Sequence, residues 1–201
     1  MKNYASHLRA PRGGGFSSDM QDISLHILDI AENSITAGAT LIKITIMEDM
    51  KCDLLSLEIE DNGKGLPENL LKEVLNPFYT TRTTRKVGLG LSLLAQAAQE
   101  AGGDVSIRSA QDRGTVVTAH FVESHIDRKP MGNLADTLLV LIAGNPAVDF
   151  VFSHVRNGMN YSLDTRLIRA GLEGVPINSS AVLSALKKYL QESLTEIKKK
   201  C

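Results

Sequence analysis

Two short glycine-bearing segments carry residue types that a bound nucleotide requires: Asp61–Gly65 (DNGKG) and Gly88–Leu91 (GLGL). Asp61 follows a run of alternating apolar residues that predicts a strand with one buried face. A carboxylate there can accept a hydrogen bond from an exocyclic amine such as that of adenine. Gly63 and Gly65 allow the backbone to turn sharply and approach the ring. A plain turn is the alternative, because Asp, Asn and Gly are common in turns.

The second segment could bind phosphate. Gly88, Leu89 and Gly90 open a predicted helix, and the free N–H groups and dipole of a helix N-terminus favour anions. The GxxxxGK[ST] pattern of a Walker loop does not occur in the chain. Segment 76–87 suits a loop that closes over phosphates, although a solvated loop is the alternative. Its threonines and basic residues are Thr80, Thr81, Arg82, Thr83, Thr84, Arg85 and Lys86.

A predicted helix with apolar residues at helical spacing over 23–35 carries Asp29, Glu32 and Asn33. Asp29 and Asn33, at i and i+4, share a face. Asn33 can give its side-chain oxygen to Mg²⁺, which prefers oxygen ligands. A carboxylate one turn earlier can orient or deprotonate a water, or hold a metal-bound water. Alone, this is an ordinary polar helix face; the downstream segments favour a nucleotide site, to which Thr115 could add a hydroxyl near the base.

The elements that must position these residues alternate in type. The pattern predicts helix 23–37, strands 41–47 and 54–60, helices 67–75 and 89–101, and strands 104–109 and 115–121. This order indicates an α/β (α+β) two-layer sandwich with a mixed sheet. Further on we expect helix 134–143, strands 149–156 and 159–163 around an Asn157-Gly158 turn, and helices capped by Asp164 or Thr165 and by Asn178 or Ser179.

We therefore expect three parts: a flexible tail or added leader at 1–18, a nucleotide-binding domain at 19–125, and a small C-terminal α+β module at 126–201. The net charge of −1 gives no electrostatic case for nucleic acid or for an anionic membrane. No apolar run approaches the roughly 20 residues that span a bilayer. Cys52 and Cys201 are too few for a disulfide framework or zinc site, so a cytoplasmic location is simplest.

In their order, these motifs resemble those of the GHKL (Bergerat-fold) ATPases, the group with gyrase B, the heat-shock chaperone, histidine kinases and MutL. Residues 30–40 (IAENSITAGAT) resemble the N-box helix of MutL-type members, and DNGKG matches the G1 box. Residues 76–82 (NPFYTTR) and 88–94 (GLGLSLL) resemble the F-box and G2 box of sensor histidine kinases. Gly114-Thr115 matches the strand-start pair of those kinases. The resemblance covers about residues 20–122.

The resemblance implies a Bergerat fold that binds ATP and Mg²⁺. It implies Asn33 as the Mg²⁺ ligand and Asp61 as the adenine reader. Gly63 and Gly65 would line the adenine pocket, whereas Gly88 and Gly90 would line the phosphate side.

Three positions bear on catalysis. Asp29 stands where the hydrolytic members have Glu, and its side chain is one methylene shorter. Glu32 also appears in MutL-like helices, although it points off the face shared by Asp29 and Asn33. Lys86 stands where the G2 box usually begins with glycine, so it could contact phosphate or replace a dispensable glycine.

The sequence leaves the use of ATP open. One hypothesis is a histidine- or serine-type protein kinase that acts in trans. The histidines are His7, His26, His120, His125 and His154, and none is followed by an acid. About 20 residues precede the ATPase-like region, too few for a phosphoacceptor hairpin, so the acceptor is expected on another protein. The alternatives are an ATP-gated switch or weak ATPase that regulates a protein partner, and a fold that has lost its nucleotide. A homodimer through the first or last helix stays open.

Overall fold

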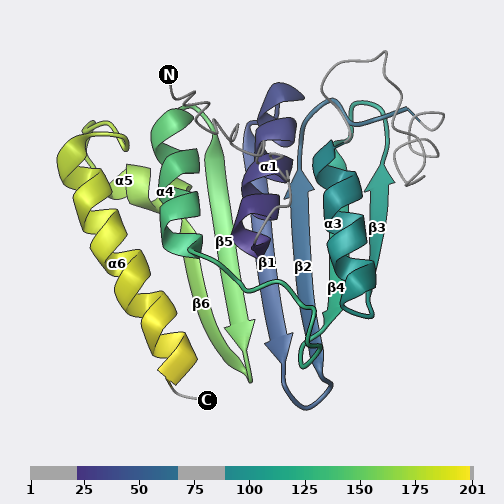
Figure 1. Ribbon diagram of the computed structural model, residues 1–201. Coiled ribbons are helices and arrows are strands. Elements are labelled where there is room, and N and C mark those ends of the chain that lie inside the picture. Colours follow the sequence, from purple (N-terminus) through teal and green to yellow (C-terminus); the bar gives the residue numbers. More distant parts are fainter. Residues whose placement is uncertain (1–21, 68–88, 200–201) are drawn as a thin grey trace, which may run out of the picture.

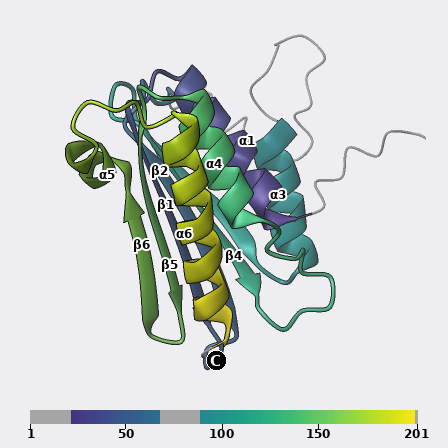
Figure 2. The same cartoon turned by 90° about the vertical axis from the view of Figure 1, so that its left-hand side faces the viewer.

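The computed structural model describes residues 22–67 and 89–199, which form two layers (Figure 1, Figure 2). The elements are α1 (Ile23–Thr36), β1 (Leu41–Asp49), β2 (Leu54–Asp61), α3 (Leu89–Glu100), β3 (Asp104–Ser109), β4 (Thr115–Val122), α4 (Leu134–Gly144), β5 (Asp149–Arg156), β6 (Met159–Asp164), α5 (Thr165–Gly171) and α6 (Ser180–Lys199). The sheet has the order β3-β4-β2-β1-β5-β6. β1 and β5 are parallel, and the other neighbouring pairs are antiparallel. The predicted two-layer fold with a mixed sheet is confirmed.

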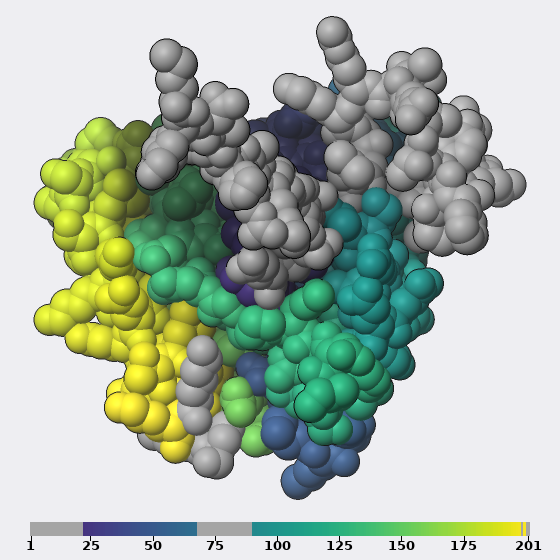
Figure 3. All heavy atoms as spheres, viewed as in Figure 1, coloured from purple at the N-terminus to yellow at the C-terminus, as the bar shows by residue number. Residues whose placement is uncertain are grey.

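Four helices cover one face of the sheet. Figure 2 shows α1, α3, α4 and α6 on the same side, and Figure 3 shows the segment that leads into α4 between α3 and α6. The other face carries polar side chains, such as the Lys43–Glu60 ion pair, whose atoms are 3.0 Å apart. None of the helices in 22–67 and 89–199 is long and apolar enough to cross a membrane.

The helix α1, which carries the N-box residues, begins and ends where its sequence predicts. The Asp22 carboxylate caps the N-terminus by accepting a hydrogen bond from a first-turn backbone N–H at 3.0 Å. At the other end Gly38 has a φ of +81°, the left-handed conformation that suits glycine after a helix. Ile27 and Ile30 lie on its buried side. Burial of this side fixes which residues α1 turns toward the solvent.

The turn between β5 and β6 also follows its sequence signal. Asn157 and Gly158 have φ values of +47° and +83°, as a two-residue hairpin turn with two positive φ angles requires. Met159 then pairs with Arg156. The following helix, α5, is capped by Asp164, which accepts a hydrogen bond from the Arg166 backbone. These local predictions are confirmed.

Residues 126–199 have no separate sheet, because β5 and β6 belong to the same six-stranded sheet as β1 to β4, and this corrects the expected separate module. β5 pairs with β1 along eight residues, and Phe152 lies opposite Ile44 on the buried face. Residues from both parts of the chain belong to one hydrophobic core. The reason is that the helix-covered face of β1 and β5 is apolar in both strands, so that parallel pairing joins the two buried surfaces.

One buried residue of α1 makes the fold sensitive to acid. The His26 side chain is 1% exposed, and neither ring nitrogen has a hydrogen-bond partner in the described part of the chain. Burial lowers the pKa of His26 from 6.5 to about 4, against the charge of Asp22, which raises it; the charge of Lys129 lowers it further. The folded protein therefore holds His26 neutral.

We predict that this histidine costs the protein stability as the pH falls. The pKa of His26 is lower in the folded state than in the unfolded state. The fold is therefore fully stable above about pH 6.5, and it loses stability as the pH falls toward about 4, because the unfolded chain binds the proton first. The free energy of unfolding should fall by about 3 kcal/mol over that window. Urea unfolding at several pH values should show this loss in the wild type and in His120→Gln, and not in His26→Leu. An equal loss in His26→Leu would contradict the prediction.

Candidate functional site

The Asp61 carboxylate lies at the end of β2 and is held in a defined orientation. Its side chain is 8% exposed. Oδ1 accepts a hydrogen bond from the Gly63 backbone at 2.8 Å, and Oδ2 accepts one from the Ser34 hydroxyl at 2.7 Å. Each oxygen keeps a further lone pair, so the carboxylate can still accept from an amine. The sequence predicted no role for Ser34, which is buried on the side of α1 that meets Asp61.

Asp61 belongs to a polar row that crosses three strands. Asp61 pairs directly with Thr115 of β4, and Thr115 pairs directly with Ser109 of β3. Directly opposed residues point to the same side of a sheet, so the three side chains share the helix-covered face. The oxygens of Ser109 and Thr115 are 2.9 Å apart. Thr115 therefore lies beside Asp61, and its contact with a base stays a prediction; the sequence predicted no role for Ser109.

The glycines after Asp61 allow backbone segments to pack closely. Gly65 has a φ of +63°, and a Cβ on it would overlap the carbonyl of Ala110. Gly63 is packed less tightly: a Cβ on it would lie 3.1 Å from the carbonyl oxygen of Ala37. A Cβ on Gly114, where φ is +80°, would overlap the carbonyl of Asp61. The sequence predicted Gly63 and Gly65 as the lining of a base pocket, which stays a prediction; the structure shows that they let the loop pack closely against its neighbours.

Asn62, in the same loop, forms hydrogen bonds with residues at the start of β1. The Asn62 side-chain oxygen accepts hydrogen bonds from the backbone N–H groups of Thr40 and Leu41 at 2.8 and 2.9 Å. Its amide donates to the Thr40 hydroxyl at 2.9 Å. From the sequence alone, Asn62 is expected to be an ordinary turn residue. Its role could not be found there, because its partners lie about 20 residues away.

Asp29 and Asn33 lie together on α1, as their spacing predicts. The Asn33 amide donates to Asp29 Oδ2 at 3.4 Å. Burial raises the pKa of Asp29, and the hydrogen bond from Asn33 partly offsets this. Gly90, in the first turn of α3, packs against the same carboxylate, and a Cβ there would overlap it. The N-terminus of α3 therefore meets the predicted metal-binding face of α1.

The remaining predicted site residues are an exposed residue of α1, the first residue of α3, and three residues outside the described ranges. Glu32 is exposed on α1, whereas Asp29 and Asn33 are half-buried. Leu89 is the first residue of α3. Arg82, Lys86 and Gly88 lie outside the described residues, as do the segment 76–87 and most of the helix expected at 67–75. Their roles stay predictions.

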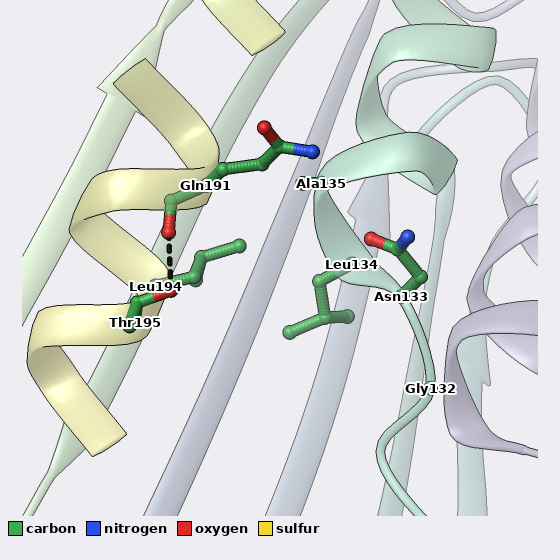
Figure 4. Close-up of a pocket in the computed structure, with 7 residues that line it drawn as sticks. All are labelled: Gly132, Asn133, Leu134, Ala135, Gln191, Leu194 and Thr195. Atoms are coloured by element: carbon green, nitrogen blue, oxygen red, sulfur yellow. Dashed lines mark hydrogen bonds between the residues drawn. The ribbon is translucent and has the colours of Figure 1, made fainter. Parts of the chain in front are cut away.

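A cavity of about 340 Å³ lies elsewhere, between the start of α4 and the C-terminal half of α6 (Figure 4). It is lined by Gly132, Asn133, Leu134, Ala135, Gln191, Leu194 and Thr195. Thr195 donates to the Gln191 carbonyl at 2.6 Å, and Asn133 caps α4 through Asp136. These polar groups are therefore satisfied by their own helices. None of the predicted nucleotide-site residues within 22–67 and 89–199 lines this cavity.

Known proteins resemble the part of the chain that holds this site. The model of the family described as histidine kinase-, DNA gyrase B-, and HSP90-like ATPase matches residues 18–125, more than half of the 201 residues. The tetrathionate sensor histidine kinase TtrS of Salmonella typhimurium is 36% identical over 103 residues, which are 49% of this chain and 17% of the kinase. The putative sensor histidine kinase NtrY-like of Rickettsia prowazekii is 29% identical over 105 residues, 52% of this chain and 17% of that protein.

The likeness extends to the fold. A crystal structure of the N-terminal domain of a DNA repair protein has a TM-score of 0.50 and 16% identity, and the match covers 73% of this chain and 53% of that one. The matches to the two sensor kinases span 17% of the length of each. The family match covers α1, the DNGKG loop and α3, which together build the site described above. The chain therefore belongs to the histidine kinase-, DNA gyrase B- and HSP90-like ATPases, and residues 18–125 are its ATP-binding domain.

Proposed function

We propose that the domain binds ATP together with Mg²⁺ and that Asn33 is the protein ligand of the metal. Asn33 donates through its amide nitrogen to Asp29, which leaves its side-chain oxygen for a cation. Within residues 22–67 and 89–199, no group of three or more His, Cys, Asp and Glu side chains could hold a metal. That fits Mg²⁺ held by one side chain, water and phosphate oxygens, where the ion neutralises charge on the phosphates.

We predict that Asn33→Ala removes the Mg²⁺-dependent part of ATP affinity. The variant loses the amide oxygen but leaves Asp61 and its partners intact, so metal-free ATP should bind as in the wild type. Calorimetry with ATP in Mg²⁺ and in EDTA should show about tenfold tighter binding with Mg²⁺ in the wild type and no difference in the variant. Ser56→Ala, on the polar face of the sheet, is the control. An unchanged Mg²⁺ effect in Asn33→Ala would contradict the assignment.

We further propose that the chain transfers the γ-phosphate to an acceptor on another protein. The observation that carries this is the position of the described histidines. His26 and His154 are buried, at 1% and 0% exposure. His120 lies five residues along β4 from Thr115, about 16 Å away, and His125 lies beyond the end of that strand. The described histidines are thus poorly placed to accept phosphate from their own site, which supports transfer in trans. We place this reaction in the cytoplasm, where the exposed thiol of Cys52 stays reduced.

Labelled ATP tests the kinase. The purified chain should be incubated with [γ-³²P]ATP alone and with proteins encoded by neighbouring genes. We expect label on one of those proteins, lost with Asn33→Ala, and none on the chain itself. Acid-labile label would identify a phosphohistidine, and acid-stable label a phosphoserine. Free phosphate without labelled protein would contradict phosphotransfer and support hydrolysis.

An ATP-gated switch is the second candidate, and a contact of α1 favours it. The backbone N–H groups of Ile23 and Ser24 donate to the carbonyls of Pro130 and Met131 at 2.9 and 3.0 Å. The segment after the ATPase domain is thus bonded directly to the helix that carries Asn33. A shift of α1 on nucleotide binding would reach residues 126–199. Nucleotide-dependent binding of a partner without label would support this candidate over the kinase.

A further inference from the structure

The Ser109 hydroxyl lies at a junction of three segments beside the candidate base pocket. It accepts a hydrogen bond from the Leu66 backbone N–H at 2.8 Å and donates to the Gly114 carbonyl at 2.9 Å. Its third neighbour is the hydroxyl of Thr115, at 2.9 Å. Ser109 therefore joins the loop after Asp61 to the turn between β3 and β4.

A count of protons decides how the two hydroxyls are oriented. A serine hydroxyl has one proton to donate and two lone pairs to accept with. Ser109 gives its proton to the Gly114 carbonyl and uses one lone pair for Leu66. In its contact with Thr115 it can therefore only accept, so Thr115 must be the donor. The proton of Thr115 is thus committed to Ser109, and no residue of the described part of the chain donates to the lone pairs of the Thr115 hydroxyl.

We infer that Ser109 is a specificity-determining residue, because it makes Thr115 a hydrogen-bond acceptor toward the purine base. This inference rests on the proposed placement of adenine at Asp61, which lies directly opposite Thr115. Two neighbouring acceptors, the Asp61 carboxylate and the Thr115 hydroxyl, match the N–H groups of a 6-aminopurine. A 6-oxopurine presents an acceptor at that position, which neither group can bind directly. The pocket therefore selects ATP over 6-oxopurine triphosphates.

Inosine triphosphate is the probe, because it carries a 6-oxo group in place of the 6-amino group of ATP and has the same ribose and phosphates. In Ser109→Ala the Thr115 hydroxyl loses its acceptor and can turn to donate to a 6-oxo oxygen. We expect the ratio of the Kd for inosine triphosphate to the Kd for ATP to fall about tenfold. Ser109→Thr retains a hydroxyl and should restore the ratio. Ser106→Ala, an exposed serine on the same strand, should leave it unchanged.

A double-mutant cycle separates this role from general support of the loop. Thr115→Val should lower the ratio as Ser109→Ala does, and the double variant should lower it no further, since both act through one hydroxyl. If Ser109→Ala weakens both nucleotides equally, Ser109 only holds the loop and the inference is wrong. If the wild type binds ATP and Asp61→Asn binds it equally well, the proposed adenine site itself fails, which is a different result.

Discussion

Asp61→Asn should lower the affinity for ATP by about 100-fold or more. The substitution replaces one carboxylate oxygen by an NH₂ group and removes the charge. The NH₂ group of the asparagine cannot accept a hydrogen bond from a purine amine, and only the remaining oxygen can. Hydrogen bonds to charged groups contribute about 1.5–3 kcal/mol, and a buried donor left without an acceptor costs a similar amount.

The fold should survive this change. The introduced amide would not repeat both contacts of the carboxylate, but its oxygen can accept from Gly63, and the Ser34 hydroxyl can turn to accept from its NH₂ group. Calorimetry with MgATP measures the affinity, and circular dichroism checks the fold. Asp104→Asn, an exposed aspartate at the start of β3, is the matched control and should bind ATP normally. A twofold or smaller effect of Asp61→Asn would show that Asp61 does not read the base.

Glu48→Gln should lower the free energy of unfolding by about 3 kcal/mol at pH 7. Glu48 is 4% exposed at the end of β1. Its carboxylate oxygens bind two residues of β5: His154 Nε2 at 2.6 Å and Arg156 Nη1 at 2.7 Å. A neutral amide would leave the Arg156 guanidinium in a largely buried place without its counter-charge. Removing one partner of such a pair is costly even where the pair itself contributes little net stability.

The pH dependence identifies the charge as the cause. Burial by itself raises the pKa of Glu48, but the hydrogen bond and charge of His154 and the charges of Arg156 and Arg128 outweigh it and hold the pKa below its usual value. The stabilisation is thus present above the ordinary carboxyl range and is lost as the pH falls through the lowered pKa. The difference between wild type and Glu48→Gln should therefore shrink in acid.

An exposed ion pair in the same sheet provides the control for Glu48→Gln. Glu60 binds Lys43 at 3.0 Å with both side chains nearly half exposed. Glu60→Gln should lower the unfolding free energy by less than about 1 kcal/mol, because exposed pairs are solvated and screened. Urea unfolding of the wild type and the two variants gives the comparison. Equal effects at both sites would mean that the β1–β5 contact does not depend on the buried charge.

The sequence by itself determined the local structure and the family of the domain, and it predicted which residues form the ATP site. The Asp164 cap before α5 and the Asn157-Gly158 turn after β5 were predicted correctly because caps and turns depend on neighbours within four residues. The sequence pattern predicted strands 54–60 and 115–121, each of which the structure extends by one residue. The spacing of Asp29 and Asn33 placed both on one face, because a helix brings i and i+4 together.

Only the tertiary structure decided what joins these elements across the chain. The pairing of β5 with β1 could not be predicted, since parallel strands about 100 residues apart leave no turn signal between them. Ser34 and Ser109 looked like ordinary polar residues until the fold brought them to Asp61 and Thr115. What a hydroxyl does depends on the groups that it contacts. When those groups are distant in sequence, burial and strand register decide which of them it meets. The motif residues were therefore readable from the sequence, and the residues that orient them were not.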